Sequence, residues 1–164
     1  MLFRSVNGVG GNRFAPHDKI TRAQFAQMLA KLAGANLSSY TSSTFSDIKT
    51  TDWFMKPVAW AADKGIVNGL GDNQFAPNAL VTRQDMAVMI KRYVDSIAFT
   101  LPKDTAVTEF SDSAAIDSYA KDAVSAMQAA GIIGGKEGNR FDPKAYATRA
   151  EACKMIYTLM QMLQ

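Results

Sequence analysis

Three stretches of the chain place apolar residues at the spacing of one face of an α-helix. In each stretch a Thr-Arg pair is followed by apolar side chains three or four positions apart, which is the period of an amphipathic helix. The three sets occupy equivalent positions and are Phe25, Met28, Leu29 and Leu32; Met86, Met89, Ile90 and Tyr93; and Ala152, Met155, Ile156 and Leu159. Because the faces are equivalent, we expect them to meet around a pseudo-threefold axis.

Local signals mark where these helices begin. A threonine at the N-cap with an acid or amide three positions later forms a capping box. The three pairs are Thr21 with Gln24, Thr82 with Asp85, and Thr148 with Glu151. Each cap should contribute about 1 kcal/mol. We expect weaker boxes where Gln24 and the shorter Asp85 replace glutamate.

Two further helices are predicted over residues 53–64 and 117–130. Gly65 and Gly131 follow them as C-terminal stops, a position that favours glycine because its backbone is left-handed. Pro57 fits only the first turn of its helix. Residues 34–44 and 99–109 are predicted to be linkers.

The chain is organised by an internal repeat. VNGVGGNRFAP from Val6 recurs as VNGLGDNQFAP from Val67 and as IGGKEGNRFDP from Ile133, at shifts of 61 and 66 residues. An F-S-D block begins the second and third copies at Phe45 and Phe110, and the first copy lacks this half. We therefore predict an all-α domain with half a repeat in 1–36 and repeats in 45–98 and 110–164. The loop phenylalanines should plug into the core; they are Phe14, Phe75 and Phe141.

Composition narrows the function classes. The 164 residues carry a net charge of +3, too small an excess to predict nucleic-acid binding, and contain no apolar run of about 18 residues. With one cysteine, Cys153, and one histidine, His17, neither an intrachain disulfide nor a Cys/His zinc site is expected. We predict no metal, no cofactor and no membrane insertion, and we interpret Cys153 as a buried structural residue.

Arginines at equivalent helix starts are the first candidates for binding. Arg22, Arg83 and Arg149 follow the capping threonines, where a cation opposes the helix dipole. An arginine at three equivalent positions where it is unfavourable indicates a functional role. A guanidinium beside the free N–H groups of a helix start suits a carboxylate or phosphate ligand. The alternative is that each arginine pairs with an acid of a neighbouring repeat, such as Asp47 or Asp112. Both roles can coexist.

Two aromatic residues near the starts of the first-half helices are further candidates. Trp53 and Tyr119 offer flat faces on which sugar rings stack, and the alternative is packing between helices. Catalysis is disfavoured: the chain has no nucleophile elbow, phosphate loop or zincin motif. Asp47 and Asp112 occur once per repeat, which is typical of architecture rather than of an acid/base pair.

The repeated blocks resemble the S-layer homology (SLH) family. The motifs on which this resemblance rests are FSD, DW, GIVNG and DNQFAPNALVTRQD in one repeat, and FSD, GIIGG and GNRFDPKAYATRAE in the other. ATRAE matches the family's T-R-A-E signature completely, whereas ITRAQ and VTRQD depart from it. The resemblance covers nearly the whole chain. It implies three SLH repeats, the first one truncated, arranged as a three-pronged pseudo-trimer around a central three-helix bundle.

The resemblance also implies a function. It implies non-covalent anchoring of exported proteins at the bacterial cell surface, cell wall or S-layer, and no catalysis. The implied ligand is an anionic, often pyruvylated, secondary cell wall polysaccharide or another peptidoglycan-linked glycan, bound in grooves between repeats. The ligand-binding candidates are then Arg22, Arg83, Arg149, Trp53, Tyr119, Gly8, Gly69, Gly135, Asp47 and Asp112.

A second hypothesis is a protein-interaction or self-assembly module. The absent first half of repeat 1 should leave core side chains uncovered, and that surface could contact another chain.

Overall fold

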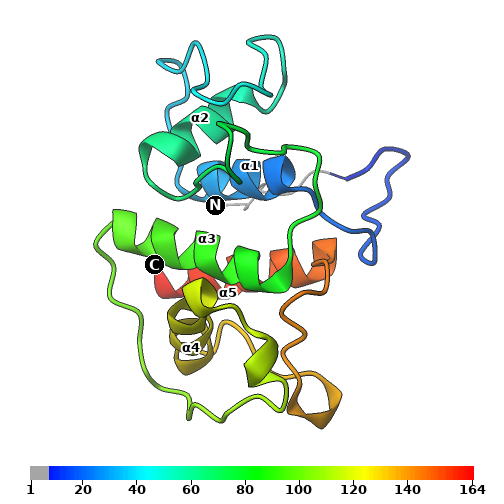
Figure 1. Ribbon diagram of the computed structural model, residues 1–164, viewed down its shortest axis with the longest axis vertical. Helices are drawn as coiled ribbons and strands as arrows, with labels where there is room; N and C mark the ends of the chain where they lie inside the picture. The colour runs from blue at the N-terminus through cyan, green and yellow to red at the C-terminus, as the bar shows by residue number, and fades with distance from the viewer. Residues whose placement is uncertain (1–7) are drawn as a thin grey trace.

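The computed structural model describes residues 8–164 and is mainly helical, as predicted (Figure 1). The helices are α1 (Arg22–Leu32), α2 (Met55–Asp63), α3 (Arg83–Ser96), α4 (Lys121–Ala129) and α5 (Arg149–Met162), with 3₁₀ turns at Ser113–Ala115, Ser118–Ala120 and Glu137–Asn139. Residues 8–164 form no strand, and none of their helices combines the length and apolarity needed to cross a membrane.

The two first-half helices are shorter than predicted. α2 begins at Met55 rather than at residue 53, and a 3₁₀ turn over Ser118–Ala120 occupies the predicted start of α4. Both helices end just before a glycine with a left-handed backbone, Gly65 at φ 67° and Gly131 at φ 71°. The predicted glycine stops are therefore present.

Capping differs between the three second-half helices. Thr21 and Thr148 begin complete capping boxes, in which their backbone N–H groups donate to the side chains of Gln24 at 3.0 Å and Glu151 at 2.8 Å. The carboxylate of Asp85 does not reach back to the backbone; it accepts a hydrogen bond from the Thr82 hydroxyl at 2.7 Å. The weaker box is thus at Asp85 and not at Gln24.

A closed ring of three backbone hydrogen bonds joins the repeats. The N–H of Ile20 donates to the carbonyl of Ala147 at 3.1 Å, the N–H of Ala147 to Val81 at 2.9 Å, and the N–H of Val81 back to Ile20 at 3.0 Å. These residues are equivalent, each preceding a capping threonine, and all three are buried. α1 packs against both α3 and α5. That a symmetric three-helix bundle surrounds this ring stays a prediction.

The same three junctions bind the first N–H groups of each helix. The first two residues of α1, α3 and α5 donate to loop carbonyls of another repeat. The acceptors are Ala79 and Pro77 for α1, Ala145 and Pro143 for α3, and Asp18 and Pro16 for α5, at 2.9 to 3.1 Å. Because the third N–H donates to the capping threonine, the first three N–H groups within each of these helices are occupied here.

The F-S-D segments hold the loops of repeats 2 and 3. The ring of Phe45 packs on Phe75 with centroids 5.4 Å apart, and both oxygens of Asp47 accept backbone hydrogen bonds, from Phe75 at 2.9 Å and Ala76 at 2.7 Å. Ala76 has φ 56°, a left-handed conformation that is costly for alanine, and the carboxylate stabilises it there. Phe110 and Asp112 make the equivalent contacts in repeat 3.

The prediction that all three loop phenylalanines are buried is wrong for one of them. Phe75 and Phe141 are 0% and 1% exposed, but Phe14 is 41% exposed. The reason is the missing partner: residues 8–164 contain no F-S-D segment for repeat 1 that could stack on Phe14. Phe14 therefore lies on the surface.

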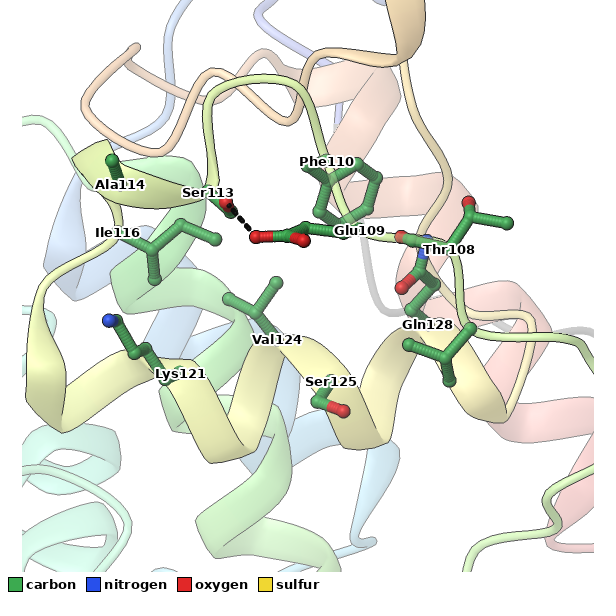
Figure 2. Close-up of a pocket in the computed structure, with 11 residues that line it drawn as sticks. Thr108, Glu109, Phe110, Ser113, Ala114, Ile116, Lys121, Val124, Ser125 and Gln128 are labelled. Carbon is green, nitrogen blue, oxygen red and sulfur yellow. Dashed lines mark hydrogen bonds between the residues drawn. The ribbon is translucent and has the colours of Figure 1, made fainter.

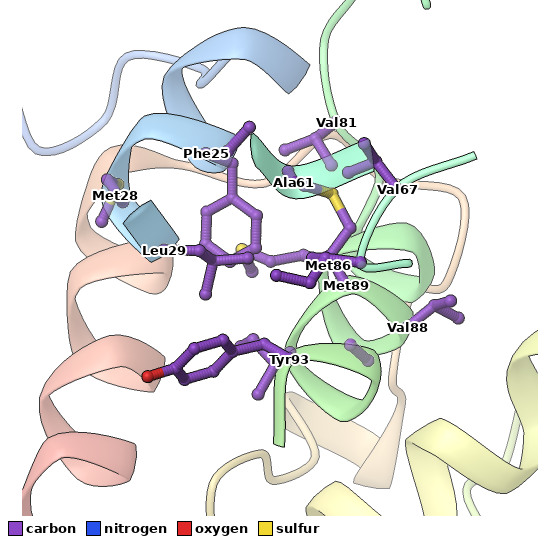
Figure 3. Close-up of a cluster of buried hydrophobic side chains, with 14 of the residues drawn as sticks. Phe25, Met28, Leu29, Ala61, Val67, Val81, Met86, Val88, Met89 and Tyr93 are labelled. Atoms are coloured by element: carbon purple, nitrogen blue, oxygen red, sulfur yellow. The ribbon is translucent and has the colours of Figure 1, made fainter. Parts of the chain in front are cut away.

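The core is shared between repeats. Side chains of α1, among them Phe25 and Leu29, meet Met86 and Met89 of α3 (Figure 3). α2 covers the outer side of α1, and α4 packs against α3 (Figure 1). α1 and α3 are thus each covered by the first-half helix of the following repeat.

We predict that Phe75→Ala destabilises the protein far more than Phe14→Ala. Removing a fully buried phenylalanine costs about 3–5 kcal/mol, whereas the exposed ring of Phe14 should cost about 1 kcal/mol or less. Denaturant unfolding followed by circular dichroism gives both values. Equal losses would contradict the difference in burial.

Candidate functional site

The motif arginines link neighbouring repeats. Each is the first residue of its helix and is 7% exposed. Each Nε donates to the carbonyl of a loop phenylalanine in another repeat: Arg22 to Phe75 at 2.9 Å, Arg83 to Phe141 at 2.6 Å, and Arg149 to Phe14 at 2.9 Å. The guanidinium carbons lie 4.7, 5.0 and 5.2 Å from the centroids of the same rings, within cation–π distance.

These contacts explain why a cation is tolerated at a helix start. A carbonyl dipole and an aromatic face offset the unfavourable helix dipole, which is worth a few tenths of a kcal/mol or more. Burial lowers the pKa of Arg22 from its ordinary value, while Asp85, Tyr119 and Asp47 oppose the change. An arginine starts so far above neutrality that the guanidinium remains charged.

One part of the predicted anion site is not available. The free N–H groups expected at each helix start donate to carbonyls and to the capping threonine, so they are not free to bind an anion. What remains at each junction is the guanidinium and the helix dipole.

The alternative, that each arginine pairs with an acid of a neighbouring repeat, holds for Arg83, although not with Asp47 or Asp112, and no such pair is seen for Arg22 within residues 8–164. The oxygens of both aspartates accept loop N–H groups, and Arg22 donates to the carbonyls of Phe75 and Asn68. The acid that pairs with Arg83 is Glu151, at 2.6 Å. The two aspartates fix loops, and a ligand role for them stays a prediction.

The first groove lies between repeats 1 and 2. It has a volume of about 320 Å³ and is bordered by residues of all three repeats. Its lining comprises Arg22, the loop Val67–Leu70, Asp85, Val88, Met89 and Arg92 of α3, and Tyr119. Three of the predicted ligand-binding residues, Arg22, Gly69 and Tyr119, therefore come together here.

Hydrogen bonds orient the aromatic residue of the first groove. The Tyr119 hydroxyl donates to Asp85 at 2.6 Å and accepts from the Gln84 amide at 2.8 Å, and the residue is 55% exposed. Desolvation of the phenol and the hydrogen bond to Asp85 raise the pKa of Tyr119 to about 12. The phenol is therefore neutral at physiological pH and adds no negative charge to the groove.

The second groove lies between repeats 2 and 3; its lining is partly equivalent to that of the first groove but contains no aromatic residue, and its charge pattern differs. Its volume is about 170 Å³, and it contains Arg83, Ile132 to Lys136, Glu151, Lys154 and Met155. Glu151 lies between Arg83 at 2.6 Å and Lys136 at 3.4 Å. Desolvation opposes ionisation, but the Thr148 N–H and these two cations together lower the pKa of Glu151.

The third set of predicted residues is only partly brought together. Arg149 contacts Phe14 of repeat 1, and Gly8 begins the described chain. Trp53 is 56% exposed and lines a separate hollow beside Gln27 and Lys31 of α1, away from the motif arginines. A groove equivalent to the first one falls partly on residues 1–7, which lie outside the described residues.

The predicted glycines have a structural reason of their own. A side chain on Gly69 would place Cβ 2.7 Å from the Gln74 carbonyl oxygen, and Gly8 and Gly135 meet equally close atoms at 2.8 and 2.6 Å. Because these glycines have no side chain, the loop backbone can approach closely at each of them. This holds whether or not they also contact a ligand.

Several groove residues were not predicted from the sequence. Val88, Met89 and Arg92 lie on α3, where the helical pattern shows a face but not what borders it. The residues equivalent to Arg92 are Lys31 in repeat 1 and Thr158 in repeat 3. Because the arginine does not recur, comparison of the repeats did not single it out. A further hollow of about 380 Å³ lies between the linker and α4, lined by Val107, Phe110, Ile116 and Val124 among others (Figure 2). It contains no motif arginine.

Comparison with known protein families shows to which family the chain belongs. The family model of the S-layer homology domain matches residues 5–26, 44–87 and 109–153. The chain belongs to the S-layer homology domain family, as its motifs indicated.

Three relatives illustrate where such regions occur. The chain is 34% identical to an exoglucanase XynX of Acetivibrio thermocellus over 95% of its own length and 14% of the relative. It is 27% identical to a cellulosome-anchoring protein of the same organism, over 92% of this chain and 34% of the relative. It is 29% identical to a surface-layer 125 kDa protein of Lysinibacillus sphaericus, over 89% and 12%. The chain thus spans between 12% and 34% of the length of these relatives.

We predict that Glu151→Gln lowers stability at neutral pH by about 1–3 kcal/mol. Glutamine keeps the capping box, as Gln24 shows, and removes only the charge beside Arg83. Because folding lowers the pKa of Glu151, its contribution is present above the unfolded pKa and disappears as the pH falls through the folded one.

Unfolding curves from pH 7 to pH 3 check this. The parent and the variant should converge at acid pH. Asp95→Asn, which breaks the exposed Lys91–Asp95 pair, is the control and should cost about 0.5 kcal/mol or less. A constant difference between parent and Glu151→Gln at all pH values would contradict the charge-based account.

Proposed function

We propose that this chain is a non-catalytic module that anchors a larger protein to the bacterial cell surface. Support comes from the family and from relatives whose names describe cellulosome anchoring and a surface layer. The matching region forms 14% of an exoglucanase and recurs in an anchoring protein, which favours a shared attachment function over a shared catalytic one.

The proposed ligand is an anionic secondary cell wall polysaccharide that carries pyruvate ketals, and the proposed principal site is the first groove. The observation that supports this choice of groove is the position of Arg22, a buried cation that borders a groove of about 320 Å³. Within residues 8–164 no carboxylate lies within ion-pair distance of it. A buried guanidinium whose charge is not neutralised by an adjacent acid is a favourable partner for a ketal carboxylate.

The other residues of the first groove fit a sugar acid. Arg92 supplies a second cation on α3, and the half-exposed ring of Tyr119 offers a face for a sugar ring. The Asp85 and Gln84 hydrogen bonds hold that ring in place, so less conformational entropy is lost on binding.

The second groove is proposed as a weaker contact. Its arginine is already paired with Glu151, so an incoming carboxylate would have to compete with an internal one. Lys136 and Lys154 can still attract the polymer. Two linked contacts on one polymer chain raise the overall affinity through effective concentration.

A second candidate function, association with another polypeptide chain, is favoured by two exposed aromatic side chains, Phe14 and Tyr157 of α5. It is compatible with polysaccharide binding because neither residue lines the first or the second groove.

We predict that Arg22→Gln weakens binding of the pyruvylated polymer about tenfold or more, whereas Arg83→Gln weakens it less than about threefold. The loss of a charge-assisted hydrogen bond of about 1.5–3 kcal/mol gives the first figure. Isothermal titration calorimetry measures both. Arg22→Lys, which keeps the charge, should retain part of the affinity.

Two outcomes would contradict this assignment. Equal losses in the two variants would overturn the choice of groove. Unchanged affinity after mild acid removal of the ketals would overturn the carboxylate as the recognised group. Thermal unfolding of each variant separates a lost ligand contact from a lost link between repeats.

We also predict that Tyr119→Phe binds within about threefold of the parent, while Tyr119→Ala loses most of the affinity. Stacking on an aromatic face needs the ring and not the hydroxyl. The same titration compares them. Equal loss in both variants would show that the hydroxyl, and not the ring, makes the contact.

A further inference from the structure

The hollow of about 380 Å³ beside α4 is a site distinct from the two grooves (Figure 2). It follows one face of the helix, because its helical lining residues stand at spacing i, i+3, i+4 and i+7: Lys121, Val124, Ser125 and Gln128. A helix rises about 1.5 Å per residue, so this face is about 10 Å long. The hollow shares no lining residue with either groove. We call it the α4 hollow.

The wall of the α4 hollow is mainly apolar. Phe110 and Val124 are buried there, and they recur as Phe45 and Val58 in repeat 2. Val107 of the preceding linker also lines the hollow and is 52% exposed. Sites for small molecules typically have volumes of about 300–1,000 Å³ and a mostly apolar lining with a few polar groups. The α4 hollow has this size and this character.

Three polar side chains in the lining do not belong to the repeat pattern. They are Glu109, Lys121 and Gln128, and their equivalents in repeat 2 are Thr44, Met55 and Ala62. Repeat 2 forms the same F-S-D segment and helix without these groups. The architecture of the repeat therefore does not require them, whereas it does use the apolar wall.

Gln128 carries a buried hydrogen-bond acceptor without a partner. The residue is 6% exposed, and its Nε2 donates to the Thr108 carbonyl at 3.0 Å. Its Oε1 has no hydrogen-bond partner among residues 8–164. Buried polar atoms are nearly always paired, so this oxygen indicates an occupant of the hollow that carries an N–H or O–H donor.

The hollow also carries one acid and one base that are not paired with each other. The Glu109 carboxylate accepts a hydrogen bond from the Ser113 hydroxyl at 2.8 Å. Neither Glu109 nor Lys121 takes part in an ion pair within the described part of the chain. In Figure 2 Lys121 lies at one end of the lining and Gln128 at the other, and the side chain of Glu109 reaches between them.

The dipole of α4 favours the same distribution of charge. Lys121 is the first residue of this nine-residue helix, and Gln128 lies in its last turn. A helix favours an anion near its N-terminus and a cation near its C-terminus. A ligand anion is thus favoured beside Lys121, and a ligand cation beside Glu109 and Gln128.

We propose that the α4 hollow binds a short apolar peptide of about two residues with free ends. Its terminal ammonium donates to the Glu109 carboxylate and to Oε1 of Gln128, and its terminal carboxylate accepts from the Lys121 ammonium. Its side chains lie against Val107 and Val124. An extended peptide spans about 3.3–3.6 Å per residue, so two residues with their charged ends match a face of about 10 Å.

A zwitterion fits the hollow better than an ion of one sign. An anionic sugar would pair with Lys121 but would be repelled by Glu109 and would leave the Gln128 oxygen unpaired. A simple cation would leave Lys121 without a partner. This inference does not depend on the polysaccharide ligand of the grooves.

Nuclear magnetic resonance titration of the full chain with leucyl-leucine tests the proposal. Amide signals of residues 107–128 should shift saturably, whereas those of the groove residues Arg22 and Arg83 should not. Leucyl-leucinamide lacks the carboxylate and N-acetyl-leucyl-leucine lacks the ammonium, so each should bind at least fivefold more weakly. Glycyl-glycine lacks the apolar side chains and should bind at least tenfold more weakly.

Two variants match the two altered ends of the peptide. Lys121→Gln should weaken leucyl-leucine at least fivefold but leave leucyl-leucinamide within twofold, because that ligand has no carboxylate to lose. Glu109→Gln should weaken leucyl-leucine at least fivefold but leave N-acetyl-leucyl-leucine within twofold. Both side chains are exposed, so the variants should keep the circular dichroism of the parent. Asp122→Asn, an exposed change on α4 outside the hollow, is the control and should stay within twofold.

Three outcomes would overturn the proposal. The first is the absence of saturable shifts with leucyl-leucine. The second is equal affinity for the dipeptide and its three analogues, which would show that neither the charged ends nor the side chains are recognised. The third is a set of shifts confined to groove residues, which would place the peptide outside the α4 hollow.

Discussion

The structure depends on three backbone hydrogen bonds that form a closed ring between Ile20, Ala147 and Val81. Each of these residues directly precedes a capping threonine, so each bond fixes the start of one helix against another repeat. The arginine that follows is thereby placed over the phenylalanine loop of that repeat. The grooves between repeats exist because backbone pairing, and not side-chain packing alone, sets the spacing of the helix starts.

Local features of the fold could be predicted from the sequence and non-local ones could not. The helices of the second halves follow from a 3.6-residue period and a threonine cap, both of which are short-range signals. The partners of Arg22, Arg83 and Arg149 are 53, 58 and 135 residues away, and no local pattern encodes such pairs. The similarity of the repeats also did not predict a difference in burial. Phe14 matches Phe75 in sequence, but the burial of this side chain depends on a neighbouring segment rather than on its own identity.

The two described grooves show how a single methylene group changes the chemistry of equivalent sites. Glu151 reaches both the backbone of Thr148 and the guanidinium of Arg83. Asp85 is shorter, and its carboxylate accepts hydrogen bonds from the hydroxyls of Thr82 and Tyr119 instead. Within residues 8–164, Arg22 consequently has no carboxylate within ion-pair distance beside its groove. The departure of repeat 2 from the family signature is therefore a difference in electrostatics and not only in capping.

The closure of the ring also limits how such a domain can grow and fold. In an open solenoid each unit contacts only its neighbours, so units can be added or removed at the ends. Here the last unit bonds back to the first, and a fourth unit has no open end to join. The hydrogen bonds that complete the ring join residues far apart in the chain. They therefore form late in folding, because the entropic cost of closing the loop comes before the pairing stabilises it. The unit of folding is thus the whole circle, and its number of repeats is fixed by geometry.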